Sequence, residues 1–231
     1  MGHTAPSSLK DVSTHFQFGE NWDSYSRLLD DQRIDQAARD LSRFLGVSDL
    51  TGQRFLDIGS GSGLHSLAAF LLGAEHVTAI DLDPSSVATT HRVLSKYMPG
   101  RDFDCRQLSV FDATTAELGQ FDIVYSWGVL HHTGAMHEAI ESASRLVADN
   151  GLLALALYRE TVLCNFWKVE KRLYSKMPAW LQALLVKAYS AKSQLGFVLK
   201  GRDFRQYLAE YKQQRGMDYE HDIHDLSLIH I

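Results

Sequence analysis

Short apolar runs alternate with amphipathic stretches through the middle of the chain. We predict strands at 53–58, 76–81, 103–109, 121–126 and 151–158, where β-rich apolar runs stand between turn residues. Apolar residues at helical spacing predict helices at 63–73, 84–97 and 135–148, and Asp83 followed by Pro84 is a typical helix start. The alternation predicts βαβ units, so the expected fold is α/β: a Rossmann-like parallel sheet flanked by helices.

Two flanking regions have helical patterns of their own. Between Asp23 and Leu45 the apolar spacing predicts one or two amphipathic helices before the first strand. After Tyr158 the strand pattern stops, and helix-spaced apolar residues continue to position 215. We therefore divide the chain into an N-terminal arm at 1–22, a sheet domain with its leading helices at 23–158, a basic helical segment at 159–215 and an irregular tail at 216–231.

Composition and charge narrow the class of protein. The 231 residues are 45% hydrophobic and 22% charged, as in ordinary soluble domains, and no signal peptide or membrane-spanning run is evident, so we predict a cytoplasmic protein. The net charge of -5 argues against general nucleic-acid binding. Residues 159–215 nevertheless carry twelve Lys and Arg against four Asp and Glu, which leaves open peripheral contact with an anionic partner or a membrane surface. A solvated helical face is the alternative.

The stretch RFLDIGSGSGLHS, residues 54–66, indicates a ligand-binding loop. Gly59, Gly61 and Gly63 follow the first predicted strand directly, and glycine permits both the unusual dihedrals of a tight turn and the close approach of a ligand. Such a loop lies at the carboxyl end of a strand and the start of a helix, where open α/β sheets bind nucleotides. Leu64 stands where a dinucleotide fingerprint has its third glycine, so a dinucleotide is disfavoured.

Acidic residues near the loop indicate which nucleotide ligand is bound. Asp57 would repel a pyrophosphate but suits an ammonium group, and Asp81 ends the second strand, where an acid accepts hydrogen bonds from ribose hydroxyls. S-adenosylmethionine carries both groups, so we predict it as the cofactor; NAD is the alternative. The predicted cofactor-binding residues of this region are Asp57, Gly59, Ser60, Gly61, Gly63 and Asp81.

Four motifs resemble those of a known family. LDIGSGSG, VTAIDLDP, QLSVFDA and FDIVYSWGVLHH are similar, in order, to the cofactor motifs of class I S-adenosylmethionine-dependent methyltransferases, especially ubiquinone-biosynthesis-type O-methyltransferases. The resemblance covers about residues 15–158. It implies that Leu82 and Val110 flank the adenine and that Trp127 lies near the methionine arm. Ser109 stands where an acid commonly binds the adenine amino group, which departs from the usual pattern.

Two histidines after the fourth predicted strand are candidate catalytic bases. Methyl transfer is an in-line displacement that depends mainly on positioning, but removal of the proton assists a hydroxyl acceptor. His131 and His132 lie where acceptor and cofactor meet in this fold, and the resemblance favours His132 because a histidine is common at its place. The alternative is that these side chains only tie the loop to the backbone. No ligand spacing indicates a metal.

Aromatic residues ahead of the sheet domain are a candidate lid. Phe18, Trp22 and Tyr25 fall within FQFGENWDSY, and aromatic faces stabilise a sulfonium cation while covering it from water. Packing of an N-terminal helix against the domain is the alternative interpretation.

We predict that the protein methylates a small molecule, at the oxygen of a hydroxyl or phenol, with segment 159–215 covering the substrate. A tRNA or other RNA methyltransferase and a non-catalytic cofactor- or partner-binding module are the alternatives. In the family an antiparallel strand pair completes the sheet after the fifth strand, and no such pattern follows Tyr158. We therefore interpret the chain as truncated at its C-terminal end and its final LSLIHI as foreign to the family.

Overall fold

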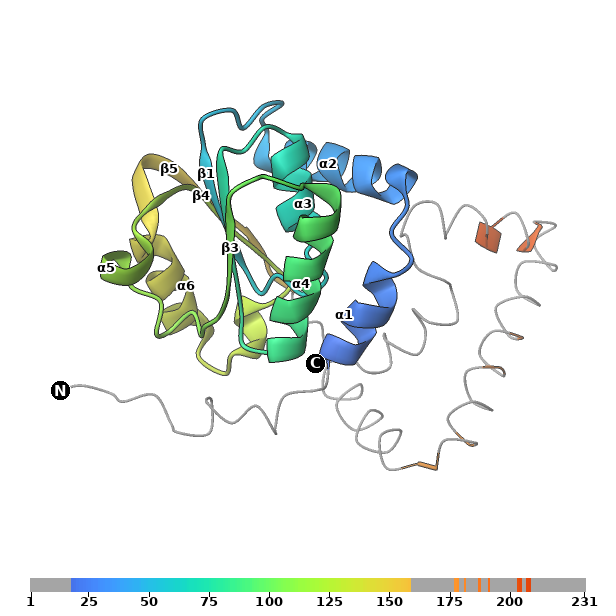
Figure 1. The fold of residues 1–231 in the computed structure, drawn as a ribbon. Coiled ribbons are helices and arrows are strands. Elements are labelled where there is room, and N and C mark those ends of the chain that lie inside the picture. The colour runs from blue at the N-terminus through green and yellow to red at the C-terminus, as the bar shows by residue number, and fades with distance from the viewer. Residues whose placement is uncertain are drawn as a thin grey trace. The chain divides into compact units, whose positions relative to one another are not determined.

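The computed structural model describes residues 18–158 and, beyond them, positions 177, 178, 181, 187, 191, 203, 204, 207 and 208. The chain divides into two compact units, Met1–Tyr158 and Arg159–Ile231. The sheet and its helices belong to the first unit (Figure 1). The predicted substrate cover at 159–215, the tail at 216–231 and the question of a terminal strand pair fall almost wholly outside the described residues. No helix among the described residues is long and apolar enough to cross a membrane.

Five parallel strands form one sheet in the order β3-β2-β1-β4-β5. They are β1 (Arg54–Ile58), β2 (His76–Asp81), β3 (Phe103–Gln107), β4 (Phe121–Trp127) and β5 (Val147–Ala156). The chain runs outward from β1 through β2 to β3 and then crosses to β4, so the order reverses between β1 and β4. Ligands of open α/β sheets bind at the carboxyl ends of the strands beside such a reversal. The predicted Rossmann-like fold is confirmed.

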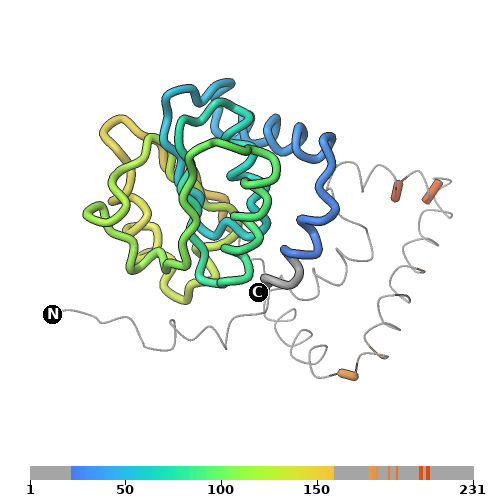
Figure 2. The backbone as a smooth tube through the Cα atoms, in the orientation of Figure 1, coloured from blue at the N-terminus to red at the C-terminus, as the bar shows by residue number. Residues whose placement is uncertain are grey.

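Helices cover both faces of the sheet (Figure 1). On one face α2 (Asp31–Leu45), α3 (Leu64–Leu71) and α4 (Pro84–Tyr97) enclose a core around Phe55, and α1 (Phe18–Ser26) packs against α4 (Figure 2). On the other face α6 (Met136–Arg145) packs in a core around Leu56, after the short helices α5 (Thr115–Leu118) and η3 (Leu130–His132). Successive strand residues point to opposite faces, so Asp57 shares the α3 face with Phe55.

A local signal accounts for the start of α4, and the predicted boundary between α6 and β5 is wrong. The Asp83 carboxylate caps α4 by accepting a 2.8 Å hydrogen bond from the Ser85 N–H, as DPSS predicts. The helix predicted at 135–148 ends at Arg145, and β5 begins at Val147 instead of 151. Val147 pairs with Phe121 while Leu152 pairs with Ile123, so the residues between them bulge from the ladder. This polar bulge has no strand-like alternation to predict it. The short helices α5 and η3 were also not predicted.

Candidate active site

The glycine loop between β1 and α3 has both the conformation and the crowding that require glycine. Gly59, Gly61 and Gly63 have φ angles of 80°, 52° and 76°. A Cβ on Gly59 would lie 2.4 Å from Cγ2 of Val129, and one on Gly63 would lie 2.9 Å from the Thr90 Cα. The loop is therefore a bare backbone surface at the carboxyl end of β1, which can approach a ligand closely.

Asp81 is held against this loop by backbone amides. The Gly61 N–H donates to Asp81 Oδ2 at 3.0 Å, and the Asp83 N–H donates to Oδ1 at 2.9 Å. Burial raises the pKa of Asp81, although both amide bonds favour the ionised form. A carboxylate has about four lone-pair sites, so two amide donors fix its orientation and leave capacity for ligand hydroxyls.

Asp57 lies beneath the loop and is almost completely buried. It is 2% exposed, and the Ser66 hydroxyl of α3 donates to its Oδ2 at 2.6 Å. Burial raises the pKa of Asp57 to about 7; the Ser66 bond opposes this rise, and the charge of Asp81 adds to it. A ligand cation nearby would favour the charged form, because opposite charges lower a carboxyl pKa.

Thr90 of α4 is a loop contact that sequence analysis missed. Its hydroxyl lies 3.0 Å from the Ser60 Oγ and donates to the Gly61 carbonyl at 3.3 Å. Ser60 and Thr90 are both buried. Ser86 and Thr89 join Thr90 on the buried side of α4, and this run of small polar residues on an inward face was the available signal for contact with polar backbone.

The three residues assigned to the adenine lie on the loops after β2 and β3. The Leu82 carbonyl accepts a 3.2 Å hydrogen bond from Gln107 Nε2, which ties these two strand ends together. Ser109 Oγ accepts from the Phe111 N–H at 3.3 Å. Val110 is 6% exposed and packs in the core of the α6 face. Leu82 thus follows Asp81 directly in the chain, and Ser109 follows β3, the strand that pairs with β2. The Val110 side chain instead packs mainly in the core.

Trp127, at the end of β4, belongs to an aromatic cluster that sequence analysis did not foresee. Its ring centroid lies 5.0 Å from that of Phe44 and 6.0 Å from that of His65. His65 Nδ1 lies 3.2 Å from the Tyr125 hydroxyl, and burial lowers the pKa of His65 to about 4. Burial also raises the Tyr125 pKa, so a neutral phenol and a neutral imidazole share this hydrogen bond. The half-exposed Trp127 therefore stands beside the first turn of α3.

The two candidate catalytic histidines have different surroundings. Their ring centroids are 4.0 Å apart in η3, and the Tyr158 ring lies 4.6 Å from that of His131. His132 is exposed. Both ring nitrogens of His131 are buried without a hydrogen-bond partner, and burial lowers the pKa of His131. Val129, just before η3, packs on Gly59, so this loop adjoins the glycine loop.

Trp22 of the proposed lid lies over the glycine loop. A Cβ on Gly61 would be 3.1 Å from the indole Cε2 and Nε1. The Tyr25 ring meets Trp22 edge to face, with centroids 6.2 Å apart. Arg92 of α4 forms a 2.6 Å ion pair with Asp23, which fixes α1 beside the loop. The side chain of Phe18 is outside the described part of the chain.

Replacement of Trp22 should reduce the change in tryptophan emission that accompanies cofactor binding and leave the part that comes from Trp127. The indole touches the loop that we expect to hold the cofactor, so its surroundings change more than those of a distant tryptophan. Fluorescence titration of Trp22→Phe with S-adenosylhomocysteine measures this, with Asp102→Ala, at an exposed residue that precedes β3, as the control that keeps every tryptophan. An undiminished response in Trp22→Phe would show that the lid does not contact the ligand.

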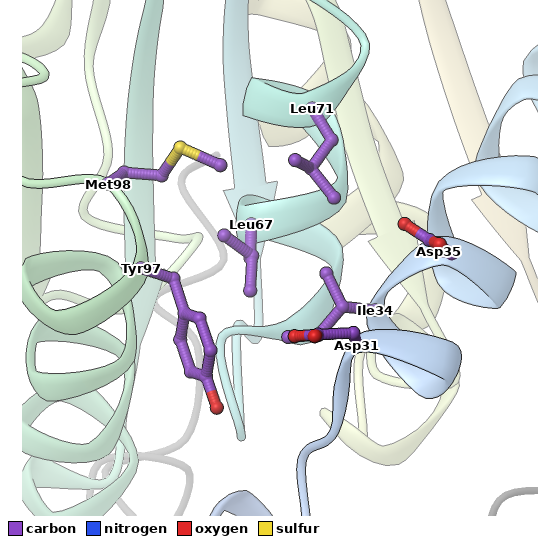
Figure 3. Close-up of a pocket in the computed structure, with 7 residues that line it drawn as sticks. All are labelled: Asp31, Ile34, Asp35, Leu67, Leu71, Tyr97 and Met98. Atoms are coloured by element: carbon purple, nitrogen blue, oxygen red, sulfur yellow. The ribbon is translucent and has the colours of Figure 1, made fainter.

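A cavity of about 170 Å³ lies away from these residues, between α2, α3 and the end of α4 (Figure 3). It is lined by Asp31, Ile34, Asp35, Leu67, Leu71, Tyr97 and Met98. None of the predicted site residues is among them. Across the described ranges, no three His, Cys, Asp or Glu side chains gather as metal ligands would.

The fold and the loop geometry define a nucleotide-binding α/β domain of the class I methyltransferase type. Residues 29–211 match a family model described as a methyltransferase domain, and this chain belongs to that family. The predicted family, its class I Rossmann-like fold and its cofactor, S-adenosylmethionine, are thereby confirmed.

Individual relatives match only part of the chain. It is 37% identical over 115 residues to a ubiquinone biosynthesis O-methyltransferase of Xanthomonas oryzae pv. oryzae, covering 49% of this chain and 46% of that one. It is 33% identical over 109 residues to a tRNA U34 carboxymethyltransferase of Aeromonas hydrophila, covering 47% and 33%. The chain thus aligns with less than half the length of these relatives. The YcgJ protein of Bacillus subtilis shares the fold, with a TM-score of 0.50, 19% identity and coverage of 61% and 59%.

Proposed function

We propose that this chain binds S-adenosylmethionine at the glycine loop and uses it to methylate a hydroxyl oxygen of a small molecule. The observation that carries the proposal is the Asp81 carboxylate, fixed by the Gly61 and Asp83 amides directly beside three left-handed glycines. This arrangement presents an oriented hydrogen-bond acceptor at a bare backbone surface. A ribose diol and an amino-acid arm fit those two features.

The other residues around the loop fit the same cofactor. Asp57 offers a buried negative charge for an ammonium group, and Trp22 covers the loop from solvent. The bound cofactor supplies a methyl group on a positively charged sulfur. Aromatic rings stabilise such a cation, so Trp22 and the exposed face of Trp127 are the residues we assign to that charge.

Two observations support a hydroxyl acceptor. The relative from Xanthomonas oryzae is named as an O-methyltransferase, and two histidines follow β4 at the edge of the sheet where the glycine loop lies. A neutral imidazole at this place can remove a hydroxyl proton as the oxygen attacks. Positioning of the acceptor by the same loop supplies the remaining acceleration.

A second candidate acceptor is RNA. The relative from Aeromonas hydrophila is named as a tRNA carboxymethyltransferase, and segment 159–215 carries the excess of Lys and Arg noted above. Methyl transfer to tRNA, with binding that weakens steeply as salt rises, would favour this candidate. Transfer to low-molecular-weight phenols or alcohols without such salt dependence supports the small-molecule acceptor.

Replacement of Asp81 tests the cofactor site. Hydrogen bonds to a charged group contribute about 1.5–3 kcal/mol, so Asp81→Ala should bind S-adenosylmethionine and S-adenosylhomocysteine about 10- to 100-fold more weakly. Calorimetric titration measures both constants. Asp102→Ala is the control, at an exposed residue just before the amino end of β3, whereas Asp81 lies at the carboxyl end of β2. A folded wild-type chain that binds neither compound would overturn the proposed function.

A further inference from the structure

His131 differs from His132 in the burial of its ring nitrogens and in its closer packing against Tyr158. Its two ring nitrogens are buried and have no hydrogen-bond partner among the described residues, and its ring packs against Tyr158 with centroids 4.6 Å apart. His132 is exposed, and its centroid is 6.1 Å from that of Tyr158. Sequence resemblance favoured His132, so the structure draws attention to the other histidine.

A buried polar atom without a partner requires an explanation. Most buried polar side-chain atoms in folded proteins are hydrogen-bonded, and leaving one unsatisfied costs about 1–3 kcal/mol. A ring nitrogen that donates to or accepts from a ligand recovers this cost only when the ligand is bound. The two unsatisfied nitrogens of His131 therefore point to a bound partner that carries a hydrogen-bonding group.

Neighbouring strands bring His131 to the cofactor loop. Val129, two residues earlier, packs on Gly59, and the Ser126 hydroxyl donates to the Ile58 carbonyl at 2.9 Å. Trp127 at the end of β4 pairs with Ala156 near the end of β5, which places Tyr158 beside η3. The tilted His131 and Tyr158 rings thus belong to the segment that contacts the first residue of the glycine loop through Val129.

We infer that His131, covered by Tyr158, is the catalytic base that takes the proton from the acceptor hydroxyl. This inference rests on the proposed function and assigns the proton to one of two adjacent histidines. Tyr158 follows the end of β5 and is 49% exposed, so its ring is free on one side to turn away when the acceptor enters. The acceptor hydroxyl then meets the imidazole in the space that the phenol covers.

The proton and electron changes balance with these groups alone. The acceptor oxygen uses a lone pair to form the new bond to the methyl carbon, while the carbon–sulfur bond breaks and its electron pair passes to the sulfur. The acceptor O–H proton moves to a ring nitrogen of His131. The imidazolium afterwards releases that proton to water and returns to the neutral base.

Burial suits His131 to this role at neutral pH. Among the described residues, the titratable side chains whose rings face it are His132 and Tyr158, and burial is the cause of its lowered pKa. An ordinary histidine titrates near pH 6.5, so His131 is neutral and able to accept a proton throughout the neutral range.

The pH profile of His131→Gln tests the assignment. Methyl transfer by the wild-type chain should fall at acid pH, with a midpoint below 6.5, as His131 becomes protonated. Glutamine can hydrogen-bond but cannot act as a base, so His131→Gln should lose about 100-fold or more in kcat and should lack the acid limb, while its calorimetric affinity for S-adenosylmethionine is unchanged. His137→Gln, at an exposed position of α6, is the matched control.

Variants of Tyr158 and a direct titration of His131 distinguish the role of His131 as the base from the role of Tyr158 in burying its ring. Tyr158→Ala should expose the imidazole and move both the acid limb and the His131 pKa, measured by NMR, up toward 6.5; Tyr158→Phe should leave both in place. Full activity in His131→Gln, loss of the acid limb only in His132→Gln, or a His131 pKa at or above 6.5 would overturn the inference. Cofactor binding without methylation of any hydroxyl by the wild-type chain would overturn the proposed function itself, together with the base.

Discussion

Between pH 4 and pH 8 the free energy of unfolding of the wild-type chain should fall by on the order of 4 kcal/mol relative to that of Asp57→Asn. The folded-state pKa of Asp57 is raised from 3.8 to about 7 because the carboxyl is buried. Well below pH 3.8 it is protonated in both folded and unfolded chains and has no effect. As the pH rises toward 7 the unfolded chain loses the proton first, so the wild-type free energy of unfolding falls. Each pH unit of difference corresponds to about 1.36 kcal/mol.

The asparagine variant isolates this effect because its side chain has no proton to lose. The Ser66 hydroxyl can donate to the amide oxygen as it does to the carboxylate. Urea unfolding of both proteins at pH 4 and pH 8 gives the change in the free energy of unfolding of each protein with pH. A packing effect of the substitution that is the same at both pH values cancels when these two changes are compared. Asp149→Asn controls for removal of an exposed carboxylate. Parallel pH dependences in Asp57→Asn and wild type would contradict the raised pKa of the buried Asp57 carboxyl.

The same substitution should weaken cofactor binding, so stability and affinity change in opposite directions. An ammonium group near Asp57 favours the carboxylate, and binding at about pH 6–7 should therefore release a proton from the wild-type chain. Calorimetry in buffers of different ionisation enthalpy measures that proton, which should be absent in Asp57→Asn. An unchanged affinity and an unchanged proton count would show that the ammonium does not lie near Asp57.

Local sequence signals were sufficient for the sheet, most helix boundaries and the glycine loop. Gly59, Gly61 and Gly63 are close together in the chain, and Asp81 ends a strand whose register against β1 follows from the parallel sheet. The short range of these relations explains the success: a strand end, a tight turn and a helix start are specified by neighbouring residues.

Contacts between residues far apart in the sequence could not be predicted in the same way. Tyr158 meets His131 because β4 and β5 pair in a register that includes a bulge, and hydrophobic alternation does not encode a bulge. Arg92 reaches Asp23 from a different helix, and Val129 fits Gly59 from a different strand end. Such contacts follow from tertiary packing, so the ranking of His131 and His132 depends on burial that the sequence does not display.

Gly63→Ala should destabilise the fold by about 2–5 kcal/mol, and no single truncation of a neighbouring side chain should reverse the loss. A left-handed conformation costs an L-residue about 1–2 kcal/mol, and overpacking adds about 1–3 kcal/mol. The atom that a new Cβ would meet at 2.9 Å is the backbone Cα of Thr90, which every side-chain substitution retains.

Gly59→Ala offers the matched comparison, because its conflict is with a side chain. The Cγ2 and Cγ1 atoms of Val129 would lie 2.4 and 2.8 Å from the new Cβ, so Val129→Ala in the same chain removes the closest contacts. In a double-mutant cycle measured by urea unfolding, the double variant should regain most of the stability that Gly59→Ala loses through overpacking. The conformational cost of about 1–2 kcal/mol should remain. If Thr90→Ala restores the stability of Gly63→Ala equally well, the loop backbone can shift at its contact with α4 and is not rigid there. If only the Gly59 pair shows rescue, the loop is held at one end by backbone and at the other by Val129, the residue that leads into the proposed base.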